Sequence, residues 1–105
     1  MATNYYVNKD TDDEKHIGKY SNGWWFLFST DLGSNKAAVM NNLRSNYRDS
    51  IKNEYDEPIS YDKMYNIIHH TARMGYINWG DYASECDGMF RDENSLFYFC
   101  DGEFC

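Results

Sequence analysis

His16 and Lys19 are the pair of side chains best suited by type and spacing to bind a small anion. They flank Gly18 and come just before Ser21-Asn22-Gly23, a sequence that favours a tight turn. An imidazole and an ammonium group beside such a turn suit the phosphates of a nucleotide-like ligand. The structural alternative, which we favour, is that His16 hydrogen-bonds the backbone across a hairpin while Lys19 is solvated. A phosphate-binding loop is excluded, because Asp13 stands where that motif requires its first glycine.

Three cysteines, Cys86, Cys100 and Cys105, lie late in the chain. Thiolate and imidazole are zinc ligands, so these cysteines together with His69 or His70 contain the donors of a four-ligand site. No Cys-x2-Cys pair is present, so we expect no metal and no cofactor. A zinc-stabilised interaction module is kept as an alternative.

The same residues supply no convincing catalytic arrangement. Nucleophile and base pairs such as Cys86 with His69 lack a local sequence that would activate them. His69 and His70 are neighbours in an expected helix, about 100° apart around its axis, so they do not face one site. We predict that the protein is not an enzyme and has no catalytic residues.

Export and membrane insertion are both disfavoured by the sequence. Residues 1–10 contain neither the basic nor the apolar stretch of a secretory signal. No run of about 18 apolar residues exists, and an odd number of cysteines implies no disulfide framework. We therefore expect a protein of a reducing cytoplasm that makes no contact with a membrane.

Acidic residues dominate the last third of the chain. The whole chain has 17 acidic and 10 basic side chains, a net charge of −7, and residues 76–105 contain seven of the acids but one arginine. Such a surface attracts a basic partner and repels nucleic acid; a solvated surface that only aids solubility is the alternative. The residues predicted to bind a basic, nucleic-acid-binding bacterial protein are Asp81, Glu85, Asp87, Asp92 and Glu93, with exposed Tyr76, Trp79 and Tyr82 as anchors.

Short segments rich in aromatic residues predict the strands that would position these side chains. Residues 24–28, Trp-Trp-Phe-Leu-Phe, are apolar on both alternating faces, which is typical of a strand covered on both sides. The predicted strands are residues 5–8, 15–19, 24–28 and 95–100, with a polar loop at 9–14 and a loop or broken helix at 80–91.

Apolar residues at steps of three and four predict two amphipathic helices. The first begins at Lys36, and its apolar positions continue to Ile51. The second follows Ser60 as its N-cap and ends at Gly75. The expected fold is a single α+β domain of residues 1–105, in which two helices pack on one face of a small antiparallel sheet with the aromatic strand near its centre.

The run His16-Ile17-Gly18-Lys19-Tyr20-Ser21-Asn22-Gly23-Trp24 resembles a motif of small bacteriophage proteins of uncharacterised function. The resemblance extends to Tyr5-Tyr6, to residues 53–60 and to residues 102–105. The chain departs from that pattern at Tyr20 and Cys105, where serine is usual, and at Asp56, where glycine is usual. The resemblance implies a phage genome and a product that acts in the cytoplasm of the infected bacterium.

By analogy, small acidic phage proteins often bind and block a host or defence protein, sometimes by imitating the charge of DNA. The leading expectation is therefore a non-catalytic inhibitor of the anti-CRISPR or anti-restriction type. The alternative from another class is a protein that binds or sequesters a nucleotide-like signal through His16 and Lys19. The sequence does not identify the target, the oligomeric state, or whether the acidic residues form one face.

Overall fold

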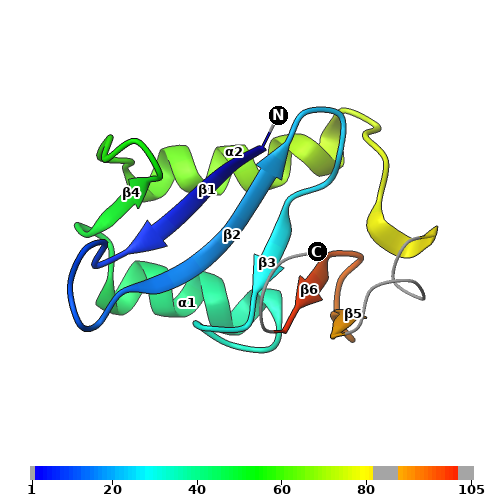
Figure 1. Ribbon diagram of the computed structural model, residues 1–105. Helices are drawn as coiled ribbons and strands as arrows, with labels where there is room; N and C mark the ends of the chain where they lie inside the picture. The colour runs from blue at the N-terminus through cyan, green and yellow to red at the C-terminus, as the bar shows by residue number, and fades with distance from the viewer. Residues whose placement is uncertain (1, 82–87, 102–105) are drawn as a thin grey trace.

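One mixed β-sheet organises the part of the chain that this computed structural model describes, residues 2–81 and 88–101. Its strand order is β4-β1-β2-β3-β6-β5 (Figure 1). In chain order the elements are β1 (Ala2–Val7), β2 (Lys15–Ser21), β3 (Leu27–Ser29), α1 (Lys36–Asn46), β4 (Ile51–Asn53), α2 (Tyr61–Arg73), the short 3-10 helix η1 (Trp79–Asp81), β5 (Met89–Arg91) and β6 (Tyr98–Cys100).

The sheet confirms the predicted α+β class but not a wholly antiparallel arrangement. Neighbouring strands run antiparallel except β3 and β6, which are parallel with Phe28 opposite Phe99. Both helices intervene between these two strands in the sequence, so no hairpin fixes their relative direction, and a long crossover permits parallel pairing. The sheet has six strands, so the prediction of a small sheet is only roughly met.

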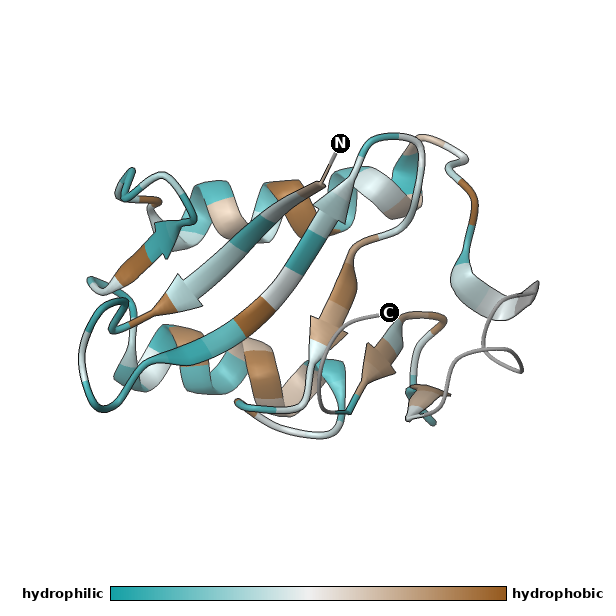
Figure 2. Cartoon of the chain, viewed as in Figure 1, coloured by the Kyte–Doolittle hydropathy of each residue, from teal (hydrophilic) through white to brown (hydrophobic). Residues whose placement is uncertain are grey.

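Both helices lie on the same face of the sheet, behind it in Figure 1. Leu43 of α1, Met64 and Ile68 of α2, and Phe28 of β3 are completely buried in one shared core. Figure 2 shows the corresponding brown, hydrophobic bands on the helices and on β3. Neither helix in the described ranges is long and apolar enough to cross a membrane.

The ends of the helices follow local sequence signals. The Asn35 side chain accepts a hydrogen bond from the Ala38 N–H at 2.8 Å, and Ser60 Oγ accepts one from the Lys63 N–H at 3.1 Å. Gly75, with φ +69°, follows the last turn of α2 as predicted.

The first helix is shorter than its apolar periodicity predicts. Helix α1 ends at Asn46, and Ile51 belongs instead to strand β4, where it pairs with Val7 of β1. Ile51 fits the helical spacing only by coincidence, because a buried edge-strand residue also needs an apolar side chain. The prediction of helix beyond residue 46 was wrong for this reason.

The aromatic segment 24–28 is buried only from Phe26 onward, since Trp24 and Trp25 are half-buried, and only its last two residues lie in a strand. Phe26 and Phe28 are completely buried, and β3 occupies a central position in the sheet. Upstream of β3, the Phe26 N–H donates to Thr71 Oγ1 of α2 at 2.9 Å, and the Trp25 N–H donates to the Ile77 carbonyl at 2.9 Å. These donors are used outside the sheet, so the strand begins later than expected.

The predicted C-terminal strand is shorter in the structure, and a second strand precedes it. Strand β6 covers Tyr98–Cys100 of the predicted 95–100, and β5 falls within the segment expected to be loop or broken helix. The same segment begins in η1, at Trp79–Asp81. The residues between η1 and β5 lie outside the described ranges.

Gly18 allows β2 to lie close to the aromatic core, and we expect Gly18→Ala to destabilise the fold. A Cβ at this position would lie 2.5 Å from the Phe26 ring and closer still to the Leu27 carbonyl oxygen. Forcing a methyl group into such a space costs about 1–3 kcal/mol of unfolding free energy. Urea denaturation measures it, with Gly80→Ala as the control, because a Cβ there lies 3.3 Å from the Tyr98 hydroxyl and has room to adjust. Equal effects in the two variants would contradict the close-packing explanation.

Candidate functional site

The predicted acidic surface of the last third is only partly within the described residues. Glu93 is exposed, whereas Asp92 is 2% exposed and does not contribute to an open surface. The placement of Asp92 in an exposed acidic patch was therefore wrong. Of the remaining predicted residues, Asp81 ends η1 without a described side chain, and Glu85, Asp87 and Tyr82 lie outside the described ranges.

Asp92 instead connects the start of α1 to the loop before β6. Its Oδ2 accepts hydrogen bonds from the Lys36 N–H at 2.9 Å and from Ser95 Oγ at 2.7 Å, and its Oδ1 accepts one from the Asn94 N–H at 3.1 Å. Lys36 is the first residue of α1, so the carboxylate satisfies a helix-end N–H and faces the positive end of the helix dipole. Burial by itself would raise the pKa of Asp92, but these hydrogen bonds outweigh it and hold the pKa below the ordinary aspartate value.

The two aromatic anchors that the structure describes are half-buried, not exposed as predicted. The Trp79 ring stacks on that of Trp24 with centroids 4.6 Å apart, and its Nε1–H donates to the Trp25 carbonyl at 2.8 Å. Tyr76 meets the His70 ring edge-on, with centroids 5.9 Å apart. Both side chains make contacts within the fold, which limits the area they can offer to a partner.

A β-bulge places His16 and Lys19 on the same face of the sheet. Residues three apart in a regular strand point to opposite faces. The register between β1 and β2 shifts at the bulge, so that Tyr6 lies opposite His16 while Asn4 lies opposite Lys19. The imidazole Nε2 of His16 lies 3.0 Å from Asn4 Oδ1, which confirms the shared face. Since Tyr5 packs into the core beneath the helices, this is the face away from them.

Both His16 and Lys19 already have partners within the fold. The His16 ring stacks on Tyr6 with centroids 5.0 Å apart, and the Lys19 ammonium lies 5.7 Å from the Trp79 ring centroid. Burial lowers the pKa of His16, and the nearby Asp31 carboxylate offsets this only in part. A neutral imidazole brings no positive charge to a phosphate, so this geometry does not favour the anion-binding interpretation. The details of the structural interpretation differ as well, because His16 Nε2 faces the Asn4 side chain across the β1–β2 pair and Lys19 lies beside Trp79.

One of the three cysteines lies within the described residues. Cys100 is buried in β6, whereas Cys86 and Cys105 lie outside the described residues. Within residues 2–81 and 88–101, no three His, Cys, Asp or Glu side chains are grouped to hold a metal ion. The zinc alternative therefore depends on residues beyond those ranges.

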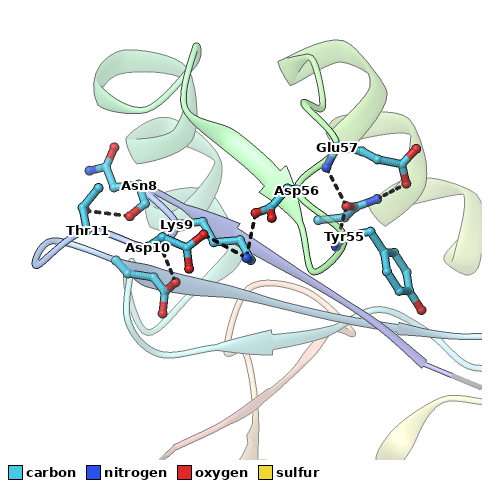
Figure 3. A network of polar contacts seen from close by, with 9 residues as sticks. Asn8, Lys9, Asp10, Thr11, Tyr55, Asp56 and Glu57 are labelled. Atoms are coloured by element: carbon cyan, nitrogen blue, oxygen red, sulfur yellow. Dashed lines mark hydrogen bonds and ion pairs between the residues drawn. The ribbon is translucent and has the colours of Figure 1, made fainter.

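Two acidic loops far apart in the sequence meet at one end of the sheet, on the left in Figure 1. Residues 8–14 join β1 to β2, residues 53–58 join β4 to α2, and together they contain seven carboxylates and one lysine, Lys9. Lys9 Nζ lies 2.7 Å from Asp56 Oδ1 and 3.2 Å from Asp10 Oδ2 (Figure 3). The hydrogen bond between Lys9 and Asp56 raises the pKa of Lys9 and lowers that of Asp56. We call these two loops the acidic end.

The backbone of the acidic end holds two of its carboxylates, those of Asp10 and Asp56, in exposed positions. Asp10 and Asp56 have φ values of +65° and +64°, a region that Asp and Asn tolerate better than most residues. Asn53 Oδ1 accepts the Glu57 N–H at 3.0 Å, which shapes the second loop. The side chains of Asp10 and Asp56 remain 72% and 59% exposed, so they face solvent or a partner.

The sequence contained half of the signal for this surface. Residues 10–14, Asp-Thr-Asp-Asp-Glu, are strongly acidic, but their local pattern predicts only a polar loop. Residues 10–14 lie beside residues 53–58 because strand β4 pairs with β1. No local sequence pattern predicts that pairing.

No protein-family model, no curated protein and no solved structure matches this chain. Function is therefore inferred from the charge and geometry of the chain itself.

Proposed function

We propose that the protein is a non-catalytic bacteriophage accessory protein that binds and inhibits a basic, nucleic-acid-binding host or antiviral-defence protein. The observation that carries the proposal is the acidic end, where two loops that contain seven carboxylates and Lys9 are joined by the ion pair between Lys9 and Asp56. A protein surface that normally holds phosphates would accept such an array, since it imitates the negative charge of a nucleic-acid backbone. The phage origin and the site of action in infected cytoplasm rest on the resemblance at residues 16–24.

The negative charge of the acidic end lowers the stability of the fold and creates an electrostatic field that attracts basic partners. Like charges gathered on one surface repel one another, and Lys9 compensates for only part of that repulsion. The same carboxylates accelerate encounter with a positively charged partner, an effect that weakens as salt concentration rises. Exposed Glu93, with Asp81, Glu85 and Asp87, is kept in the proposal as a second acidic contact.

The test begins with a pull-down of tagged protein from the lysate of infected bacteria at low and high salt. The captured basic protein is then purified, and its association with Asp10→Asn/Asp12→Asn/Asp56→Asn protein is measured by surface plasmon resonance. We expect this triple variant to bind at least about tenfold more weakly, mainly through slower association. Asparagine tolerates the positive φ at positions 10 and 56, so the loops keep their shape.

Asp62→Asn is the matched control, because Asp62 is an exposed carboxylate of α2 outside the acidic end. A second variant, Asp81→Asn/Glu85→Gln/Asp87→Asn, tests the C-terminal contact separately. If neither triple variant binds more weakly than the control, inhibition through an acidic surface is wrong. Weakening by the second variant alone would move the contact from the acidic end to the C-terminal third.

A further inference from the structure

A pocket of about 260 Å³ lies between the end of β2 and one side of helix α2. The helix contributes residues at steps of three and four, which share one face. Its lining residues are Tyr20, Lys63, Asn66, Ile67, His70 and Arg73. No part of this pocket belongs to the acidic end or to the predicted partner-binding residues.

The pocket is locally cationic in a chain whose net charge is −7. Among the ion pairs of the described residues, none includes Lys63 or Arg73, so both charges are uncompensated there. The acidic neighbour Asp62 is adjacent to Lys63 in the helix and therefore lies about 100° around its axis. The lining contains two basic side chains and no carboxylate, which favours an anion as the ligand.

The floor of the pocket is apolar and fixed. Tyr20 and Ile67 are partly buried against the main core. The Tyr76 ring contacts His70, another lining residue, edge-on. The apolar wall formed by Tyr20 and Ile67 is thus positioned before a ligand arrives, which reduces the entropic cost of binding, whereas the polar lining residues are exposed.

We propose that this pocket binds a small phosphate-bearing ligand no larger than a nucleoside monophosphate. Two cations suit a dianionic phosphate, whereas a single carboxylate would leave one of them unmatched. Lys63 and Arg73 are about 15 Å apart along the helix, so binding one phosphate between them requires both long, flexible side chains to reach toward the middle of the pocket. The planar part of the ligand lies against Tyr20 and Ile67, and the volume, just below that of drug-sized sites, limits its size.

The probes are adenosine monophosphate, inorganic phosphate and adenosine, titrated into the full chain by isothermal titration calorimetry. We expect adenosine monophosphate to bind at least about tenfold more tightly than adenosine. The variant Lys63→Ala/Arg73→Ala should lose at least about tenfold of that affinity, while Arg44→Ala, an exposed arginine of α1, should lose none. Alanine favours helix at both positions, and an unchanged circular dichroism spectrum verifies the fold.

Absence of saturable binding by any probe, or equal binding by wild type and the double variant, would overturn the proposal. Equal affinity for inorganic phosphate and adenosine monophosphate would overturn the role of Tyr20 and Ile67 but support an anion site at Lys63 and Arg73. The site does not require the proposed inhibition, because its residues are not those of the acidic end.

Discussion

Replacing Phe28 with alanine is expected to lower the free energy of unfolding by about 3–5 kcal/mol. Phe28 is completely buried at the centre of a group of rings. Its centroid lies 5.1 Å from that of Phe26, 5.5 Å from Phe97 and 4.9 Å from Phe99. Removing the ring loses its transfer free energy and leaves a cavity that the rigid strands β3 and β6 cannot close. Since small domains have about 5–15 kcal/mol of stability in total, this loss is a large fraction of it and brings the variant close to unfolding at the low end of that range.

Urea denaturation followed by tryptophan fluorescence measures this loss, and Phe90→Ala is its control. Phe90 stacks on the same Phe99 ring at 5.6 Å but is 36% exposed, so its loss should cost less than about 2 kcal/mol. If the two variants were equally destabilised, Phe28 would not be the centre of the core.

Asp92→Asn should have the second-largest effect, a loss of about 2–3 kcal/mol, although it preserves the shape of the side chain. The carboxylate accepts from donors on both oxygens, at Lys36, Asn94 and Ser95. An amide has only one acceptor oxygen, so its NH2 group must oppose one of these N–H or O–H donors in a buried site. The adjacent exposed Glu93→Gln is the control and should change stability by less than about 0.5 kcal/mol. If Asp92→Asn lowered the free energy of unfolding no more than Glu93→Gln, the Asp92 carboxylate would not stabilise the fold through these hydrogen bonds.

The pH dependence gives this role an independent readout. The pKa of Asp92 is lower in the folded protein than its ordinary value, so the charged form stabilises the fold. That stabilisation is complete above the unfolded pKa of about 3.9 and is lost as the pH falls through the folded value. The difference in stability between wild type and Asp92→Asn should therefore shrink below about pH 4, whereas it should be constant between pH 6 and 8. A constant difference down to acidic pH would show that the carboxylate charge is not responsible.

Features set by neighbouring residues in the chain were predicted correctly from the sequence. Ser60 caps its helix through an N–H group three residues away, and Ser21-Asn22-Gly23 forms a turn closed by the Trp24 N–H to the Ser21 carbonyl at 3.0 Å. Residues 26–28 of the aromatic segment are buried for an equally local reason, because consecutive large apolar residues in a polar chain favour the core.

The features that matter for function depend on contacts between distant residues. Lys9 and Asp56 are 47 residues apart, and Lys36 and Asp92 are 56 apart. The sequence showed that Asp92 is acidic, but it could not show that the start of α1 would reach it and bury it. The shared face of His16 and Lys19 depends on the bulge between β1 and β2.

The sequence alone therefore determined the two helices, the tight turn, the aromatic core and the excess of negative charge, since each of these follows from residue types within a few positions of one another. Only the tertiary structure decided which carboxylates are exposed, where the acidic end forms and where the cationic pocket of α2 lies. Strand pairing brings these groups together, and the free energy of pairing comes from packing over the whole sheet, which no local segment encodes.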